Sequence, residues 1–188
     1  MIAIFSRSKI FVLLSLVGSI ASAQSHGRSS LESTVHNAIN FYTAQENIAL
    51  GDTTSSFTGF SFERREATSR VVLFHADSPI DISFREYECS DMDCELISVY
   101  PRCFYHAETG GFSISNFITA LRFGLDTLLS ENVRHESVSM VKFWQSGGNI
   151  YGKISFEESN YATKKAFVCD KSLNFQCEES GSNLPNEP

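Results

Sequence analysis

The clearest structural signal in the chain is a β-hairpin in its second half, where residues 137–157 read SVSMVKFWQSGGNIYGKISFE. Ser146-Gly147-Gly148-Asn149 supplies a turn, because glycine accepts the positive φ angles that two-residue hairpin loops require. The flanking runs, Ser137–Gln145 and Ile150–Glu157, are rich in β-branched and aromatic residues. We therefore predict two antiparallel strands here and a third at Thr163–Cys169.

A helix is predicted before this hairpin, beginning at Ser113 or Ser115 and ending near Glu131. Its apolar residues recur every three or four positions, as they do on one face of a helix. They are Ile114, Phe117, Ile118, Leu121, Leu125 and Leu128. Asn132 follows and tolerates the left-handed backbone conformation in which helices commonly end.

The first half of the chain repeats this order of elements. Ser29–Gly51 reads as a helix, with Ser29 and Glu32 spaced as a capping box and Gly51 at a typical helix end. Its apolar stripe consists of Leu31, Val35, Ala38, Ile39, Tyr42 and Ala49. The predicted strands that follow are Phe57–Arg64, Arg70–Ala76 and Ile80–Cys89.

The chain is thus predicted to be an α+β protein with two αβββ-type halves, residues 24–107 and 108–177, which indicate an internal duplication. The first half has an additional strand, Glu95–His106, in which Pro101 cannot donate a ladder hydrogen bond. That strand should lie at an edge or contain a bulge. We expect an antiparallel sheet of six or seven strands with both helices on one face, followed by a disordered tail at 178–188.

The N-terminal residues have the pattern of a secretory signal peptide over residues 1–23. Arg7 and Lys9 precede an apolar run, residues 10–20, and Ala21-Ser22-Ala23 provides the small residues that signal peptidase recognises. The run is too short to span a bilayer, which takes about 20 apolar residues. We predict cleavage near Ala23, a secreted or periplasmic location, and no membrane span in the mature chain.

Composition excludes several partner classes. The 188-residue chain carries 15 Lys and Arg against 22 Asp and Glu, and loss of Arg7 and Lys9 takes its formal net charge from −7 to −9. Such a charge repels phosphate backbones and anionic lipid. Binding to nucleic acid is therefore not expected.

The five cysteines are interpreted as disulfide partners, because export places them in an oxidising compartment. Spacing favours the bonds Cys89–Cys94 and Cys169–Cys177, each closing a short loop at a strand end. Cys103 is left over, either as a small buried hydrophobe or as a thiol that pairs with another chain. No C-x-x-C pair is present, so no metal site and no cofactor are predicted.

Three histidines are candidate catalytic groups: His75 with Asp77, His106 with Glu108, and His135 beside Glu136. Cys103 could supply a nucleophile to such a histidine. The chain lacks a nucleophile elbow, a phosphate-binding glycine loop and an H-E-x-x-H motif. No catalytic residue is therefore assigned.

The acidic loop between Cys89 and Cys94 has two interpretations. Asp91, Asp93 and Glu95 alternate like the first ligands of a calcium loop. Leu96 and Arg102, however, replace the glycine and the glutamate that such a loop requires at its sixth and twelfth positions. An acidic hairpin closed by a disulfide is the favoured interpretation.

The additional strand is the predicted interaction surface, because an uncovered edge with Tyr and Arg side chains suits pairing with another protein. The predicted binding residues are Tyr100, Arg102, Phe104, Tyr105, Asp91 and Asp93. The alternative is that other elements cover this strand. The face of the sheet that has no helix is predicted to carry charged residues, which contact solvent or a partner. They are Arg64, Arg85, Glu86, Lys142 and Lys164.

The sequence therefore predicts an exported, non-enzymatic protein-interaction module, such as an inhibitor, an adaptor or an assembly factor. Its mature size and helix-on-sheet duplication are similar to those of secreted tandem-repeat inhibitors of β-lactamase, although no motif is shared. One alternative is a small hydrophobic-ligand binder, with an apolar cavity lined by the many phenylalanines. The other is a small hydrolase that uses Cys103 with His106 or His75.

Overall fold

The computed structural model describes residues 19–188 except 91–92, 104–110, 159–160, 172–174 and 182–183. Two helices are present in this part of the chain, α1 (Ser19–Glu46) and α2 (Ile114–Ser130), with a short 3-10 turn at His135–Ser137. The strands are β1 (Phe57–Arg64), β2 (Ser69–Ser78), β3 (Asp81–Cys89), β4 (Cys94–Cys103), β5 (Val138–Ser146), β6 (Asn149–Glu158), β7 (Tyr161–Cys169) and β8 (Cys177–Ser180).

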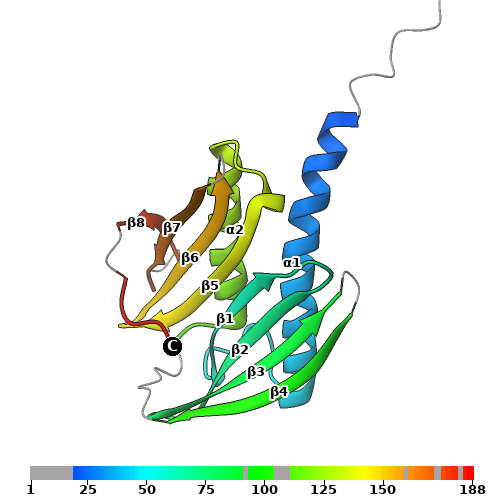
Figure 1. Cartoon of the computed structure of the whole chain (residues 1–188). Helices are drawn as coiled ribbons and strands as arrows, with labels where there is room; N and C mark the ends of the chain where they lie inside the picture. The colour runs from blue at the N-terminus through cyan, green and yellow to red at the C-terminus, as the bar shows by residue number, and fades with distance from the viewer. Residues whose placement is uncertain (1–18, 91–92, 104–110, 159–160, 172–174, 182–183) are drawn as a thin grey trace, which may run out of the picture.

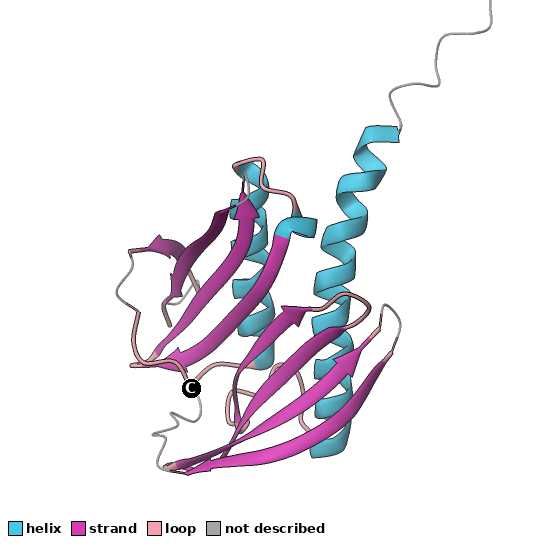
Figure 2. Cartoon of the chain, in the orientation of Figure 1, coloured by secondary structure: helices cyan, strands magenta, loops and turns pink. Residues whose placement is uncertain are grey.

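These strands form one antiparallel sheet in the order β4-β3-β2-β1-β5-β6-β7-β8 (Figure 2). The α+β class is confirmed, but among the described residues the sheet has eight strands rather than the predicted six or seven. Each half of the chain contributes a meander, and the two meanders meet where β1 pairs with β5. The outermost strands are consequently β4 and β8.

The prediction of a disordered tail from residue 178 is wrong for the residues of β8. The Cys169–Cys177 disulfide holds Cys177 opposite Cys169, and the ladder continues with Glu178 opposite Val168. A polar composition indicates disorder only for a segment that nothing holds against the folded part of the chain. Here the disulfide itself fixes the first residue pair between β7 and β8.

Both helices lie on the same face of the sheet, as predicted (Figure 1). α2 begins at an N-cap, Ser113, whose hydroxyl accepts a hydrogen bond from the Asn116 backbone N–H, while the Asn116 side chain accepts one from the Ser113 backbone. It ends before Asn132, whose φ of 64° is left-handed. The predicted end of α2 at this asparagine is confirmed.

The bounds predicted for the first helix are wrong at both ends. α1 starts at Ser19, ahead of the expected cap at Ser29, and ends at Glu46 rather than Gly51. Asn47 adopts a φ of 55°, and the Ile48 N–H bonds to the Thr43 carbonyl at 3.0 Å. This closure satisfies an end carbonyl of the helix, so α1 ends as α2 does.

The main core fills the space between the helices and the sheet. The ring of Phe57 on β1 lies edge-on to Phe117 of α2, with centroids 5.0 Å apart, and 5.7 Å from Tyr42 of α1. All three side chains are almost fully buried. Burial of such a ring contributes roughly 1.5–3 kcal/mol, so these contacts hold both helices to the same face.

The two halves approach closely at the junction of β1 and β5. Gly59 pairs with Trp144, and Phe60 pairs with Phe143, whose ring it stacks against at 5.7 Å. A Cβ on Gly59 would lie 2.3 Å from the Phe143 carbonyl oxygen, and its φ is 151°. Only glycine allows this approach.

Both predicted disulfides are present. Cys89–Cys94 joins the end of β3 to the start of β4, and Cys169–Cys177 joins β7 to β8. In the described part of the chain, no helix has the length and hydropathy needed to cross a membrane.

Candidate functional site

β4 forms a long edge of the sheet, which confirms the predicted edge position of the additional strand. Its pairing with β3 shifts between Glu86 and Tyr87, so Ile97 is an extra residue in a bulge. Ile97 and Val99 are 52% and 54% exposed, and Tyr100 is 38% exposed. The apolar side chains of this edge strand are therefore exposed to solvent.

A groove of about 410 Å³ crosses the face of the sheet that has no helix, from β5 to β4. We call it the open-face groove. Its lining residues are Ser61, Arg70, Val72, Phe74, Phe84, Tyr100, Pro101, Arg102, Lys142 and Pro188. The groove thus joins the edge strand to the centre of the sheet.

The floor of the groove belongs to a second apolar cluster, separate from the main core. Its buried members are Val72, Phe74, Ala76, Ile82, Phe84 and Trp144. Phe74 meets Phe84 edge-on at 5.3 Å, and Phe84 stacks on Tyr100 at 5.3 Å. A row of aromatic rings therefore runs from β2 to the exposed ring of Tyr100 on β4.

Trp144 closes this cluster on the side of β5. Its side chain is fully buried, and within the described residues its indole N–H has no hydrogen-bond partner. The ring lies 6.1 Å from that of Tyr151 and 6.0 Å from the Nζ of Lys142. A buried indole N–H normally finds an acceptor, so a buried one without an acceptor is unusual.

Cationic side chains border the groove of this acidic protein. Arg70 donates to Glu86 at 2.5 Å, and this hydrogen bond raises the pKa of the guanidinium and lowers that of the carboxyl. Burial lowers the pKa of Lys142, against the opposing influence of Glu187, while Arg102 and Lys153 add repulsion. Lys142 therefore carries a charge that is costly to leave unpaired.

The C-terminal segment, residues 184–188, lies on this face of the sheet, and the chain ends beside β5 (Figure 1). Leu184 packs against the second apolar cluster. Glu187 accepts hydrogen bonds from Lys153 at 2.7 Å and Lys142 at 3.3 Å, and Lys142 also donates to the Pro188 main-chain oxygen at 2.9 Å. Burial would raise the pKa of Glu187, but the two lysines together lower it.

The structure brings together two of the predicted binding residues, Tyr100 and Arg102, both in the open-face groove. Asp93 lies at the other end of β4, where its carboxylate accepts the Cys94 N–H at 2.9 Å. Phe104, Tyr105 and Asp91 lie outside the described residues. Asp93 is therefore not part of the groove.

Sequence reasoning assigned Arg85 to the wrong face of the sheet. Because Phe84 points into the open-face groove, its neighbour Arg85 points toward the helices. There it forms an ion pair with Glu46, and its guanidinium lies 5.4 Å from the ring centre of Tyr42. The groove residues that the sequence did not indicate include Arg70, Phe74 and Phe84. The alternating pattern of β2 and β3 could have placed them on this face.

His75 lies in a buried hydrogen-bond network rather than in an open cleft. Its Nδ1 is 2.8 Å from the Tyr42 hydroxyl, and its Nε2 is 3.7 Å from an Asp77 oxygen. Burial raises the pKa of Tyr42 and lowers that of His75, so the phenol stays neutral. An activated nucleophile requires the opposite shift.

The remaining catalytic candidates do not assemble into a site among the described residues. The Nε2 of the buried His135 lies 3.0 Å from the Leu125 carbonyl oxygen, which ties the 3-10 turn to α2. The Cys103 side chain, His106 and Glu108 lie outside the described residues. In the part that is described, no group of three or more His, Cys, Asp or Glu side chains could hold a metal ion.

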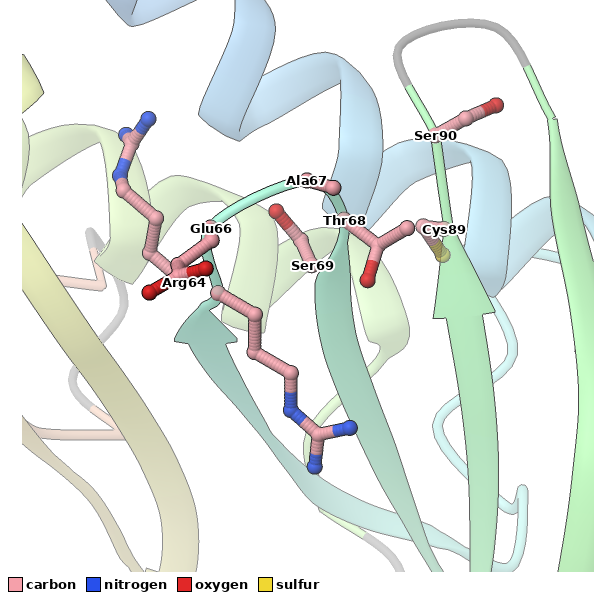
Figure 3. Close-up of a pocket in the computed structure, with 8 residues that line it drawn as sticks. Arg64, Glu66, Ala67, Thr68, Ser69, Cys89 and Ser90 are labelled. Carbon is pink, nitrogen blue, oxygen red and sulfur yellow. The ribbon is translucent and has the colours of Figure 1, made fainter.

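A second pocket, of about 370 Å³, lies beside the β1–β2 turn (Figure 3). It is lined by the turn residues 64–69 together with Cys89 and Ser90. Arg64 donates to the main-chain oxygens of Val138 and His135, at 3.1 and 3.4 Å. Its guanidinium thus joins the turn to the second half of the chain instead of facing a ligand.

No family model matches the chain, and no curated protein matches it either. Among solved structures, it is similar to a candidate lipoprotein of Clostridium difficile 630, with a TM-score of 0.44 and 10% sequence identity. That match covers 76% of this chain and 90% of the other. At so low a similarity, we draw no conclusion about fold or function from it.

Proposed function

We propose that the protein is an exported, non-enzymatic interaction module, such as an inhibitor, adaptor or assembly factor. It binds an extended segment of a partner protein along β4. The observation that carries this proposal is the exposed apolar edge of β4, with Ile97 and Val99 more than half exposed. A strand edge offers unpaired main-chain groups to which a partner strand can add.

The contrast between the two edges supports a binding role for β4. β8 is four residues long and carries Glu178 and Glu179, and short, charged edge strands resist pairing with other chains. β4 is ten residues long, and its exposed side chains include Leu96, Ile97, Val99 and Tyr100. Retaining such an edge without a use would favour aggregation.

Export is supported by the signal pattern of residues 1–23 and by the two disulfides, which are typical of proteins in oxidising compartments. Ser19–Ala23 form the first part of α1, so cleavage near Ala23 would shorten that helix. The mature protein would then be secreted or periplasmic.

A non-enzymatic role is supported by the surroundings of His75. It is hydrogen-bonded to a buried neutral phenol, Tyr42, and so serves packing between α1 and β2. The apolar-ligand and Cys103 hydrolase alternatives stay predictions.

Capture of a partner tests the proposal. The mature chain, immobilised and exposed to an extract of its compartment, is expected to retain a saturable partner protein. Val99→Lys should reduce this capture at least tenfold, because it places a charge in the strand interface. Tyr161→Lys on β7, where the side chain is 77% exposed, is the matched control and should leave capture unchanged. Equal capture by the Val99→Lys and wild-type chains would contradict the proposal.

A further inference from the structure

The contacts of residues 184–188 show which chemistry the open face of the sheet accepts beside the open-face groove, of which Pro188 forms one wall. A leucine side chain lies on the Trp144 cluster, a carboxylate lies between Lys142 and Lys153, and a main-chain oxygen accepts from Lys142. Each contact uses a different property of the segment: apolar area, negative charge and an exposed main-chain acceptor. Together they are the contacts that an extended acidic peptide makes.

Lys142 and Lys153 share one side-chain carboxylate of the segment, that of Glu187. Arg102 and Lys153 both repel the Lys142 ammonium group. Charge-assisted hydrogen bonds to partly buried cations are among the stronger polar contacts in proteins. A segment with a second carboxylate at this place would give each of the two lysines its own acceptor, and would therefore bind better than residues 184–188 do.

We propose that the open face of the sheet, from the open-face groove to Lys153, binds an extended acidic segment of a partner protein, and that residues 184–188 cover part of this site until the partner displaces them. This inference rests on the proposed interaction role and adds the chemistry of the partner. The basic groove also concentrates an acidic partner near β4, despite the net negative charge of the chain.

A tethered occupant lowers the affinity for any competing segment. A segment tethered through a short linker has an effective concentration in the millimolar range. A competitor must exceed this value, or must make contacts that the tethered segment lacks. Weakening the tethered segment should therefore strengthen binding of an added peptide.

The test uses a fluorescein-labelled peptide with the sequence of residues 181–188 and the substitution Asn186→Glu, followed by fluorescence anisotropy. The full chain with Glu187→Lys should bind this peptide about tenfold more tightly than the wild-type chain, since its own segment is repelled by the lysines. Adding Lys142→Met to that chain should abolish binding. A peptide carrying Glu187→Lys should bind neither chain.

Glu178→Lys makes the same charge change on β8 and serves as the control. This variant is expected to bind the peptide with the same affinity as the wild-type chain. Circular dichroism verifies that each variant is folded. Equal affinity of the wild-type and Glu187→Lys chains for the peptide, or binding that Lys142→Met leaves intact, would overturn the inference.

Trp144, the single tryptophan of the chain, gives a second measurement. In a chain that ends at Ser180, its emission should shift to the red and its quenching by acrylamide should increase, and the acidic peptide should reverse both. Unchanged emission would overturn the inference. If partner capture depends on Val99 but the peptide does not bind, the groove inference is wrong and the β4 proposal stands. If the peptide binds but capture does not depend on Val99, the β4 proposal is wrong and the groove inference stands.

Discussion

Cys89 and Cys169 occupy corresponding positions in the two halves: each ends the third strand of its meander and is bonded to the first residue of the fourth. The two bonds nevertheless hold different strands. β4 is ten residues long and pairs with β3 over its whole length, whereas β8 has four residues. The second bond therefore matters more to the strand that it anchors.

Removal of each disulfide should cost about 2–3 kcal/mol of unfolding free energy, from the loop-closure entropy of short loops. The double variant Cys169→Ser/Cys177→Ser should in addition lose amide exchange protection throughout β8. Cys89→Ser/Cys94→Ser is the matched variant and should keep β4 protected. Protection of β8 without its disulfide, in hydrogen exchange experiments, would show that the bond does not anchor this strand.

Gly59→Ala should destabilise the junction between the halves by about 2–3 kcal/mol or more, because the new methyl group overlaps main-chain atoms of Phe143 and Trp144. The matched control is Gly51→Ala, where a Cβ would meet no atom within 4 Å. Urea unfolding measures both. Similar small effects for the two variants would mean that the β1–β5 contact adjusts freely.

Most of the sheet could be predicted from local sequence, since hairpin turns and period-two alternation are local properties. β1 matches its predicted bounds, and the turn at Gly147 and Gly148 has the expected positive φ angles. β8 could not be predicted, because the three polar residues after Cys177 pair with β7 only when the disulfide holds them in place. The similar order of elements in the halves supports duplication, which stays a proposal.

The groove was predictable only in part. Tyr100 and Arg102 were found because they lie on an apolar strand with an edge-marking proline. Their partners Phe74, Phe84 and Lys142 come from strands that are distant along the chain, so only the strand order brings them together. The C-terminal segment was missed because its contacts depend on two lysines of other strands.

The pH dependence of stability should reveal His75. Burial, reinforced by Arg85, lowers its pKa in the folded chain, whereas Glu46 and Asp77 oppose this shift. The unfolded chain therefore binds a proton more readily, so stability is complete above the ordinary value of 6.5 and falls as the pH drops below it. Urea unfolding at pH 8 and pH 5 measures the loss, about 1.4 kcal/mol for each unit of lowering.

His36 adds to this loss, because burial lowers its pKa as well. His75→Gln, which can still hydrogen-bond to the Tyr42 hydroxyl, should remove part of the pH dependence, and His36→Gln should remove the rest. The comparison runs between pH 8 and pH 5, a range that lies above the ordinary pKa values of Asp and Glu side chains. A His75→Gln chain with the full wild-type loss between pH 8 and pH 5 would contradict the assignment.

The exposed edge of β4 should also cause self-association. Ile97 and Val99 present apolar side chains on a strand that has, in the described part of the chain, no neighbouring strand on its outer side, a combination that promotes pairing of identical edges at high concentration. Val99→Lys should lower the aggregated fraction after refolding and change the unfolding free energy by no more than about 0.5 kcal/mol, since the side chain is already exposed. Light scattering and urea unfolding measure the two quantities. A large loss of stability would mean that Val99 packs within the fold, and the same substitution could then no longer be used to identify β4 as the surface that binds a partner.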